Sequence, residues 1–354
     1  MRRKEKINAP TTRYQGSKRR ILPWLETIFS TLEFNTALDG FGGSGSVGYW
    51  LKSMGKEVTF NDLLKSNYQT GVALIENNNI TLNESDINHI FNEQSSHNSN
   101  NTIATIYEDV YYLDKENRLL DNLIYNIETL SDMYSGAELK YKKALAYHIL
   151  FQACLAKRPF NLFHRKNLNL RTKTVKRSFG NKKTWDKSFQ EHFRNFNTEY
   201  AKFIKSNDKK NKAINQDIFS VTGKFDLVYL DPPYSRKHHN SPQNYAEMYH
   251  FLEGIMNYNN WEKNIDLTRV HKPFKCTKSN WNSDLTKNFD ALFKKFSNSI
   301  IVVSYGNKGK PSIDTIVKLL KKYKKNVTTI SHPYSYKLNR NNGIGYREVI
   351  IIGR

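Results

Sequence analysis

The tetrapeptide Asp231-Pro232-Pro233-Tyr234 has the clearest chemical potential in this sequence, and it directly follows an apolar stretch that predicts a strand. The Asp231 carboxylate and the Pro232 carbonyl can both accept hydrogen bonds from an exocyclic amino group, while the two prolines stiffen the turn. The Tyr234 ring offers a flat face on which a heterocycle can stack. Together these residues predict a site that holds an aromatic amine.

A glycine-rich turn, Asp39-Gly40-Phe41-Gly42-Gly43-Ser44-Gly45, follows an earlier predicted strand. Its glycines allow the backbone to approach a ligand closely, and Asp39 could receive a cationic ligand group or fix the loop. The spacing differs from the dinucleotide pattern G-x-G-x-x-G, and no Lys-Ser or Lys-Thr pair follows as in a phosphate-binding loop. The turn therefore favours a cofactor other than NAD or ATP, with an ordinary tight turn as the alternative.

Two further segments could complete a cofactor site. Asp62 follows the predicted strand 57–60 and lies 23 residues after Asp39, a spacing typical of the acid that binds ribose hydroxyls in a βαβ unit. A helix cap is the alternative role for Asp62. In the segment Arg13–Lys18, Tyr14 could pack on a cofactor and Lys18 could pair with its carboxylate, unless the segment is a surface turn before an amphipathic helix.

The formal net charge of +22, from 55 basic and 33 acidic side chains, predicts a nucleic-acid partner. General lysine richness from an A/T-rich genome is the alternative explanation. Between Lys157 and Lys187 there are 11 Lys or Arg residues and a single acid, Asp186, interleaved with aromatic residues. Because such cations can neutralise phosphates while arginine and aromatic groups reach bases, this stretch predicts a surface that reads nucleic acid.

Other classes of protein are disfavoured. No run of about 18 apolar residues indicates a membrane span, and the basic N-terminus lacks the apolar stretch of a secretory signal. Two cysteines, Cys154 and Cys276, are too few for a disulfide framework or a cysteine zinc site. The adjacent His238 and His239 have poor geometry for a metal. We therefore expect a cytoplasmic protein without a metal.

Strands alternate with helices on both sides of a long interruption, which predicts a doubly wound, mostly parallel α/β sheet. Helices are expected to begin near residues 46 and 311. Residues 64–205 interrupt the alternation and predict an inserted, largely helical subdomain, so that 1–63 and 206–354 form the catalytic domain. The expected strands are 36–38, 57–60, 213–215, 225–230, 299–304, 326–331 and 347–352.

The order of these segments resembles the Dam-like, D12-class DNA adenine-N6 methyltransferases over nearly the whole chain outside the insertion. Phe-Gly-Gly-Ser-Gly and Asp-Pro-Pro-Tyr are specific in combination, and Gln216–Phe219 adds support. The resemblance implies S-adenosylmethionine as cofactor and a class I methyltransferase fold, whose seven-stranded sheet has one antiparallel strand near its edge. It also implies that the following residues surround the cofactor: Tyr14, Lys18, Asp39, Phe41, Gly42, Gly43, Gly45, Asp62, Asp217, Ile218 and Asp231.

For the insertion, Arg158-Pro159-Phe160-Asn161-Leu162-Phe163 resembles the Phe-Asn segment that precedes the family's DNA-reading hairpin. The loop 235–241 is polar and basic, and we interpret it as closing on DNA, with an ordinary surface loop as the alternative. A target adenine would be flipped out of double-stranded DNA and stacked on Tyr234. The residues expected to contact DNA are Arg158, Asn161, Arg165, Lys166, Arg171, Lys173, Arg236 and Lys237.

Rival functions share parts of this pattern. Cytosine-N4 transfer also methylates an exocyclic amine, but the tetrad of that class more often begins with serine than with the Asp231 found here. A sequence-specific DNA-binding protein that has lost catalysis would not need both motifs intact. No block of the sequence indicates a nuclease, so a restriction enzyme associated with this protein would be a separate chain.

Overall fold

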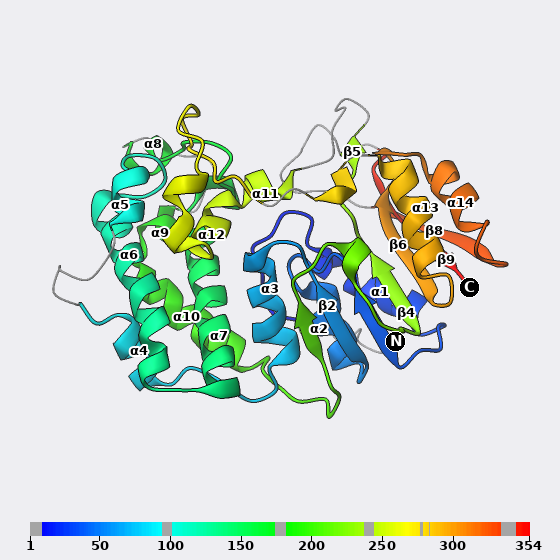
Figure 1. Cartoon of the computed structure of the whole chain (residues 1–354), viewed down its shortest axis with the longest axis horizontal. Coiled ribbons are helices and arrows are strands. Elements are labelled where there is room, and N and C mark those ends of the chain that lie inside the picture. The colour runs from blue at the N-terminus through cyan, green and yellow to red at the C-terminus, as the bar shows by residue number, and fades with distance from the viewer. Residues whose placement is uncertain are drawn as a thin grey trace.

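A seven-stranded sheet in the order β3-β2-β1-β4-β6-β9-β8 forms the centre of the catalytic half (Figure 1). The computed structural model describes residues 9–93, 101–173, 182–236, 244–276, 279–282, 284–333 and 345–354. The strands are β1 (Thr36–Asp39), β2 (Glu57–Asn61), β3 (Lys212–Ile214), β4 (Leu227–Leu230), β6 (Ile300–Gly306), β8 (Val327–Pro333) and β9 (Arg347–Gly353).

The pairing of these strands confirms the predicted fold class. β1 pairs in parallel with β2 and β4, and β4 pairs in parallel with β6. β9 is antiparallel to both β6 and β8, so one reversed strand lies next to the edge. Each predicted strand appears within a few residues of its expected bounds, because apolar runs bounded by polar turns mark buried strands clearly.

Alternate side chains of the strands enter two separate apolar cores. Ala37, Leu227 and Tyr229 point into the core shared with α1 (Leu22–Phe29) and α2 (Ser46–Ser53). Leu38, Val228 and Leu230 point into the opposite core, which α13 (Leu285–Lys295) and α14 (Ile313–Leu320) cover. Burial on both faces explains why these strands are apolar throughout rather than alternating.

The helical half lies beside the sheet, on the left of Figure 1. Its longest helix, α7 (Gly136–Ala156), is buried along most of its length. It packs against α3 (Lys65–Gly71), α10 (Phe189–Ala201) and the turn after α3. It also shares a continuous apolar core with the first face of the sheet, so the two halves are not independently packed. Its helices are α4 (Glu84–Ile90), α5 (Thr102–Ile106), α6 (Asp114–Glu128), α7 (Gly136–Ala156), α8 (Asn169–Thr172), α9 (Lys182–Asp186) and α10 (Phe189–Ala201).

The packing differs from the predicted domain bounds at two places. α3 (Lys65–Gly71) contacts β2 and β3, so the catalytic layer continues past residue 64. A second stretch, 244–276, joins the helical half through α11 (Tyr245–Met248) and α12 (His250–Ile255). Aromatic contacts hold residues 244–276 against the helical half. Local sequence patterns cannot reveal such contacts between distant segments.

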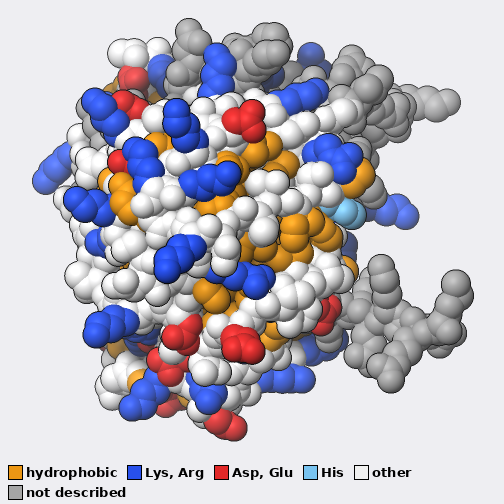
Figure 2. Space-filling model, turned by 90° about the vertical axis from the view of Figure 1, so that its right-hand side faces the viewer, with side chains coloured by type: hydrophobic (Ala, Val, Ile, Leu, Met, Phe, Trp, Pro, Cys, Tyr) orange, Lys and Arg blue, Asp and Glu red, His pale blue; other side chains and the backbone are white. Residues whose placement is uncertain are grey.

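Basic side chains are spread over the face that carries α13, α14 and β8 (Figure 2). On this face Lys322 pairs with Asp290 at 3.0 Å. The excess of positive charge is therefore not confined to the stretch between Lys157 and Lys187, and net charge alone does not locate a DNA surface.

The part of the chain that the structure describes holds neither a membrane-spanning helix nor a metal-binding cluster. None of the helices there is long and apolar enough to cross a membrane. In the same ranges, no three His, Cys, Asp or Glu side chains are grouped as a metal would require. His238 and His239 lie outside the described residues.

Candidate active site

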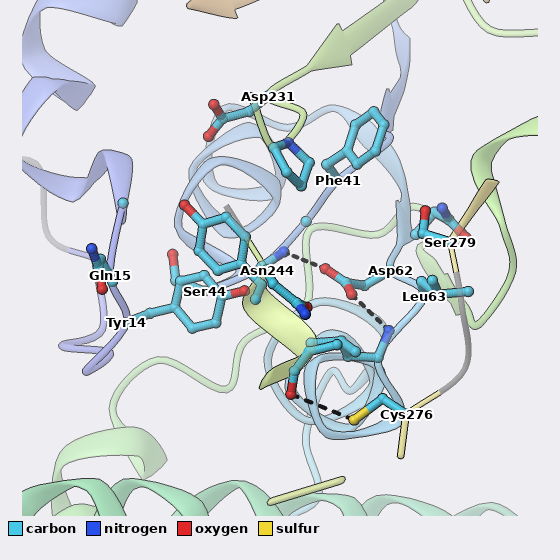
Figure 3. A pocket seen from close by; sticks show the side chains of 18 of the residues that line it. Tyr14, Gln15, Phe41, Ser44, Asp62, Leu63, Asp231, Asn244, Cys276 and Ser279 are labelled. Carbon is cyan, nitrogen blue, oxygen red and sulfur yellow. Dashed lines mark hydrogen bonds between the residues drawn. The ribbon is translucent and has the colours of Figure 1, made fainter. Parts of the chain in front are cut away.

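The carboxyl ends of β1, β2 and β4 meet at one edge of the sheet, where a cavity of about 520 Å³ lies. Asp39 ends β1, Asp62 follows β2 and Asp231 follows β4, and all three line the cavity. Figure 3 shows Asp231 and Phe41 at one end, Cys276 at the other and Asp62 between them. Parallel strands bring together residues that are far apart in the sequence at this edge.

Most of the residues predicted to bind a cofactor face this one cavity, and their contact with a cofactor stays a prediction. Gly45 is not among the lining residues; it precedes α2 with a φ of 72°. Pro232 and Tyr234 are also outside the lining, whereas Pro233 belongs to it. The predicted cofactor residues that line the cavity are Tyr14, Lys18, Asp39, Phe41, Gly42, Gly43, Asp62, Asp217, Ile218 and Asp231.

Asp231 is held by a lysine. The Lys18 Nζ lies 2.8 Å from both Asp231 carboxylate oxygens, and Lys18 is buried. Burial raises the pKa of Asp231 to about 6, although Lys18 opposes this shift; the Glu348 carboxylate adds to it. The sequence predicted that Lys18 would pair with a cofactor carboxylate; in the structure its ammonium contacts Asp231, and the contact with a cofactor stays a prediction. The pair fixes the Asp231 carboxylate in the orientation that faces the cavity.

Asp39 and Asp62 differ in how their oxygens are satisfied. Asp62 accepts hydrogen bonds from the backbone N–H of Gly43 at 2.8 Å and of Leu64 at 2.9 Å. The Asp39 Oδ2 is buried beside Gly48 of α2, where an added Cβ would lie 3.0 Å from it. Burial, with the Asp231 charge second, raises the pKa of Asp39 to about 8, and burial raises that of Asp62 to about 6. Both carboxyl groups line the cavity, where each can accept from a ligand that brings a donor or a positive charge.

The glycine turn has a packing role that its sequence did not reveal. A Cβ added at Gly42 would lie 1.9 Å from the Phe60 ring, and one at Gly71 would lie 2.3 Å from it. Phe60, at the end of β2, is fully buried. Gly43 has a φ of 50°, which a side chain disfavours, and its N–H is the one that Asp62 binds. Gly42 therefore makes room for Phe60, while Gly43 shapes the turn.

Tyr14 forms the middle ring of an aromatic stack. Its ring is parallel to Tyr249 at 4.6 Å and to Tyr245 at 5.6 Å between centroids. The Tyr249 hydroxyl accepts a hydrogen bond of 2.7 Å from the Gln15 N–H, and Asn67 donates to the Tyr14 hydroxyl. No motif in the sequence associates Tyr245 or Tyr249 with the site.

Tyr234 is not among the residues that line the cavity. Its hydroxyl lies 2.8 Å from the Tyr346 hydroxyl, and its ring contacts Tyr305 with centroids 4.4 Å apart. Trp281, another residue that sequence analysis missed, donates from Nε1 to the Pro233 carbonyl at 2.7 Å. Its indole also packs edge-on against Phe41. Trp281 thereby joins the Asp-Pro-Pro-Tyr turn to the glycine turn, although no local sequence pattern marks it.

The stretch 264–276 covers the opposite end of the cavity and was also missed. Asp266, Arg269 and Lys275 line the cavity from this stretch. The Cys276 thiol donates to the Ala246 carbonyl at 3.4 Å, and burial raises the pKa of this thiol. Cys276 is thus held as a neutral thiol, which gives it no role as a nucleophile.

Comparisons with known proteins agree with this geometry. The family model described as D12 class N6 adenine-specific DNA methyltransferase matches residues 14–308, from the Tyr14 stack to beyond the Asp-Pro-Pro-Tyr turn. The chain belongs to this family. It is also similar to the type II methyltransferase M2.HphI of Haemophilus parahaemolyticus, with 28% identity over 343 residues and 93% of each chain covered. As a D12-class enzyme, the protein methylates adenine N6 in DNA, and its family and fold imply S-adenosylmethionine as the methyl donor.

Arg158 lies in the interior of this methyltransferase, contrary to the prediction that it contacts DNA. It is 1% exposed, and it donates to the Leu162 carbonyl at 3.1 Å and to the Arg165 carbonyl at 2.7 Å. Its guanidinium also lies 4.4 Å from the centre of the Tyr111 ring. Burial lowers its pKa to about 10, which still leaves it charged at neutral pH. Arg158 fixes the fold of the basic stretch from within.

Arg171 is likewise engaged inside the protein. It forms two hydrogen bonds with the Glu116 carboxylate, at 2.8 and 2.9 Å, and Lys157 lies 2.9 Å from the same group. The guanidinium of Arg171 therefore neutralises a protein carboxylate, which differs from its predicted role at a phosphate. A run of basic residues in a sequence does not reveal which members pair with distant acids.

Three of the other residues predicted to contact DNA are on the surface. Arg165, Lys166 and Lys173 are exposed. Asn161 is half-buried and accepts from Arg13 at 3.5 Å, and Phe160 before it is 51% exposed with a φ of 67°. Arg236 belongs to the short strand β5 (Ser235–Arg236), and Lys237 lies outside the described residues. Contact with DNA stays a prediction for these residues.

Replacing Arg158 with alanine should lower the free energy of unfolding by about 3 kcal/mol, because two carbonyls lose their donor and a desolvated cation–π contact is lost. Urea denaturation measures this change. Arg165→Ala is the matched control, since this neighbouring arginine is exposed, and it should change stability by less than about 0.5 kcal/mol. Wild-type stability in Arg158→Ala, combined with weaker DNA binding, would support direct contact with DNA instead.

Proposed function

We propose that the cavity holds S-adenosylmethionine and that Asp231 holds the N6 amino group of a flipped-out adenine. The observation that carries this proposal is the placement of Asp231 at one end of a cavity that Asp39, Asp62 and the glycine turn also line. Asp39 lines the cavity and fits a cationic group of the cofactor, and Asp62 fits its ribose hydroxyls. When bound, the cofactor supplies an electrophilic methyl group.

The adenine amine needs activation because its lone pair is delocalised into the ring. Hydrogen bonds from N6 to the Asp231 carboxylate and to the Pro232 carbonyl favour a pyramidal nitrogen whose lone pair is free to attack. Positive charge develops on N6 during transfer, and a carboxylate that Lys18 already orients stabilises this charge without reorganisation. No covalent enzyme intermediate is required.

The target base reaches this site only if it leaves the duplex. Double-stranded DNA would lie over the open end of the cavity and contact the exposed Arg165, Lys166 and Lys173. For the adenine to stack on Tyr234, that ring must exchange its contact with Tyr305 for the base. Membership of a restriction–modification pair is supported by the type II name of the relative, with any endonuclease on a separate chain.

Transfer of a labelled methyl group from S-adenosylmethionine to unmethylated DNA, followed by nucleoside analysis, tests the proposal. Label in N6-methyladenine supports it, and mapping of the modified sites gives the recognition sequence. Label in N4-methylcytosine would change the assigned base while keeping the chemistry. Cofactor binding without any labelled DNA would contradict the proposed reaction.

Replacing both Arg165 and Lys166 with alanine should weaken DNA binding and reduce the slope of log K against log salt by about 2, as expected when two phosphate contacts are lost. Fluorescence anisotropy across a salt series measures both quantities. The matched control replaces Lys321 and Lys322, which follow α14 on the face in Figure 2, and should leave the slope unchanged. Equal slopes for wild type and the Arg165/Lys166 variant would remove these residues from the interface.

A further inference from the structure

The reversed strand β9 brings an additional carboxylate to the active-site edge of the sheet. β9 is antiparallel to β6, so its first residues lie where the parallel strands end. Glu348, its second residue, is opposite Gly306 at the end of β6. Glu348 is 1% exposed. A buried carboxylate costs free energy unless it is paired with a cation or hydrogen-bonded.

Glu348 shares one of its partners, Lys18, with Asp231. Glu348 Oε1 lies 3.4 Å from the Lys18 Nζ and accepts a hydrogen bond of 2.8 Å from the Ser304 hydroxyl. The same Lys18 Nζ contacts Asp231 at 2.8 Å. One ammonium group is therefore shared between two buried carboxylates, and these three side chains carry a net charge of about −1 when all are ionised.

We propose that Glu348 is a positioning residue for methyl transfer, which holds Lys18 against Asp231 and balances the lysine charge. Without Glu348, the Lys18–Asp231 pair would be neutral overall and would stabilise the positive charge on N6 less well. With Glu348, the lysine orients Asp231 while the local field stays negative. This inference rests on the proposed role of Asp231 and adds a residue that does not touch the substrate.

The charges around Asp231 come from several elements. Lys18 at the start of the first helical turn and Glu348 on β9 contact each other, Asp39 ends β1, and Tyr229 lies on β4. Lys18 lowers the pKa of Asp231 and Glu348 raises it. Removing the Glu348 charge therefore lowers the pKa of Asp231, so the rise in activity with pH moves to lower pH.

Glu348→Gln tests the inference, because glutamine can still accept from Ser304 and Lys18 but carries no charge. Single-turnover transfer at saturating DNA and cofactor should slow about 10-fold or more, a lower bound taken from the loss of one preorganised stabilising group. The acid limb of the pH–rate profile, where activity rises with pH, should move to lower pH, and the KM for the cofactor should change little. A rate within about twofold of wild type with an unmoved acid limb would overturn the inference.

Two other variants separate this role from a structural one. Glu348→Asp keeps the charge, so the acid limb of its pH–rate profile should stay at the wild-type pH, and its rate should exceed that of Glu348→Gln. A displaced acid limb in Glu348→Asp would overturn the inference even if the glutamine variant does not fold. Asp86→Asn is the matched control, because Asp86 is also a buried carboxylate that pairs with a buried lysine, Lys142, at 2.6 Å. Asp86 is on α4 and does not line the cavity. It should lower stability without moving the acid limb.

The outcome is also distinguishable from failure of the proposed function. If Asp231→Ala retains methyl transfer, the role of Asp231 is wrong, and the inference about Glu348 fails with it. If Asp231→Ala is inactive while Glu348→Gln matches wild type, the proposed function stands and the inference about Glu348 alone is wrong.

Discussion

Asp231→Ala should abolish methyl transfer and leave the affinity for DNA nearly unchanged. The variant loses the carboxylate that accepts from N6 and stabilises its developing charge, and removal of one such preorganised group costs roughly 10²–10³-fold or more in rate. Its effect on DNA affinity should be small because Asp231 lies inside the cavity, away from the exposed Arg165 and Lys166. Single-turnover transfer and anisotropy measure the two quantities on the same preparation.

Asp231→Asn is the companion to this experiment. Asparagine keeps the shape and one oxygen acceptor, but it removes the negative charge that Lys18 shares with Glu348. It should therefore bind cofactor and DNA while transferring methyl groups far more slowly than wild type. If both variants lose DNA binding as well as methyl transfer, Asp231 maintains the structure and its catalytic assignment is wrong.

The sheet and the cavity were predictable because both depend on local signals. A buried parallel strand is a short apolar run, and the polar residue that ends it, such as Asp39 or Asp231, must lie at the ligand-binding edge. The spacing of Asp39 and Asp62 then places them on neighbouring strands. Chain connectivity alone brings these side chains to one cavity.

The parts of the site that were missed depend on contacts between distant segments. Trp281 reaches Pro233 across 48 residues, and Glu348 reaches Lys18 across most of the chain. Neither contact has a periodic signature in the sequence. Arg158 was misassigned for the converse reason: a basic run indicates charge, but burial is decided by partners such as Tyr111, which lie elsewhere in the chain.

The stack of Tyr14 between Tyr245 and Tyr249 has a further consequence for the architecture. Tyr245 and Tyr249 belong to the stretch that packs with the helical half, while Gly43 of the cofactor turn lies next to Tyr14. A Cβ added at Gly43 would lie 3.1 Å from the Tyr14 ring. The same aromatic group therefore contacts the predicted cofactor turn and the half predicted to read DNA, so the two are connected through packed side chains.

Gly42→Ala should impair both stability and cofactor binding. The added methyl group would lie 1.9 Å from the fully buried Phe60 ring, so either the ring or the turn must move. Overpacking of this kind costs about 1–3 kcal/mol. Gly42 donates to the Asn61 carbonyl and precedes Gly43, so a displaced turn moves the N–H that Asp62 accepts. Calorimetric titration with S-adenosylmethionine should show affinity reduced by about 10-fold, the equivalent of about 1.4 kcal/mol.

Two comparisons isolate the clash as the cause. Gly55→Ala places a methyl group at another glycine, with a φ of 75° and no atom within 4 Å, so it should cost about 1–2 kcal/mol of stability and leave cofactor affinity intact. In a Phe60→Ala background the ring is absent, and Gly42→Ala should then cost far less than in wild type. An undiminished cost in that background would show that Gly42 is required for its backbone conformation or for the ligand itself. A diminished cost would show that position 42 must be glycine because Phe60 on β2 occupies the space beside it, rather than because the cofactor does.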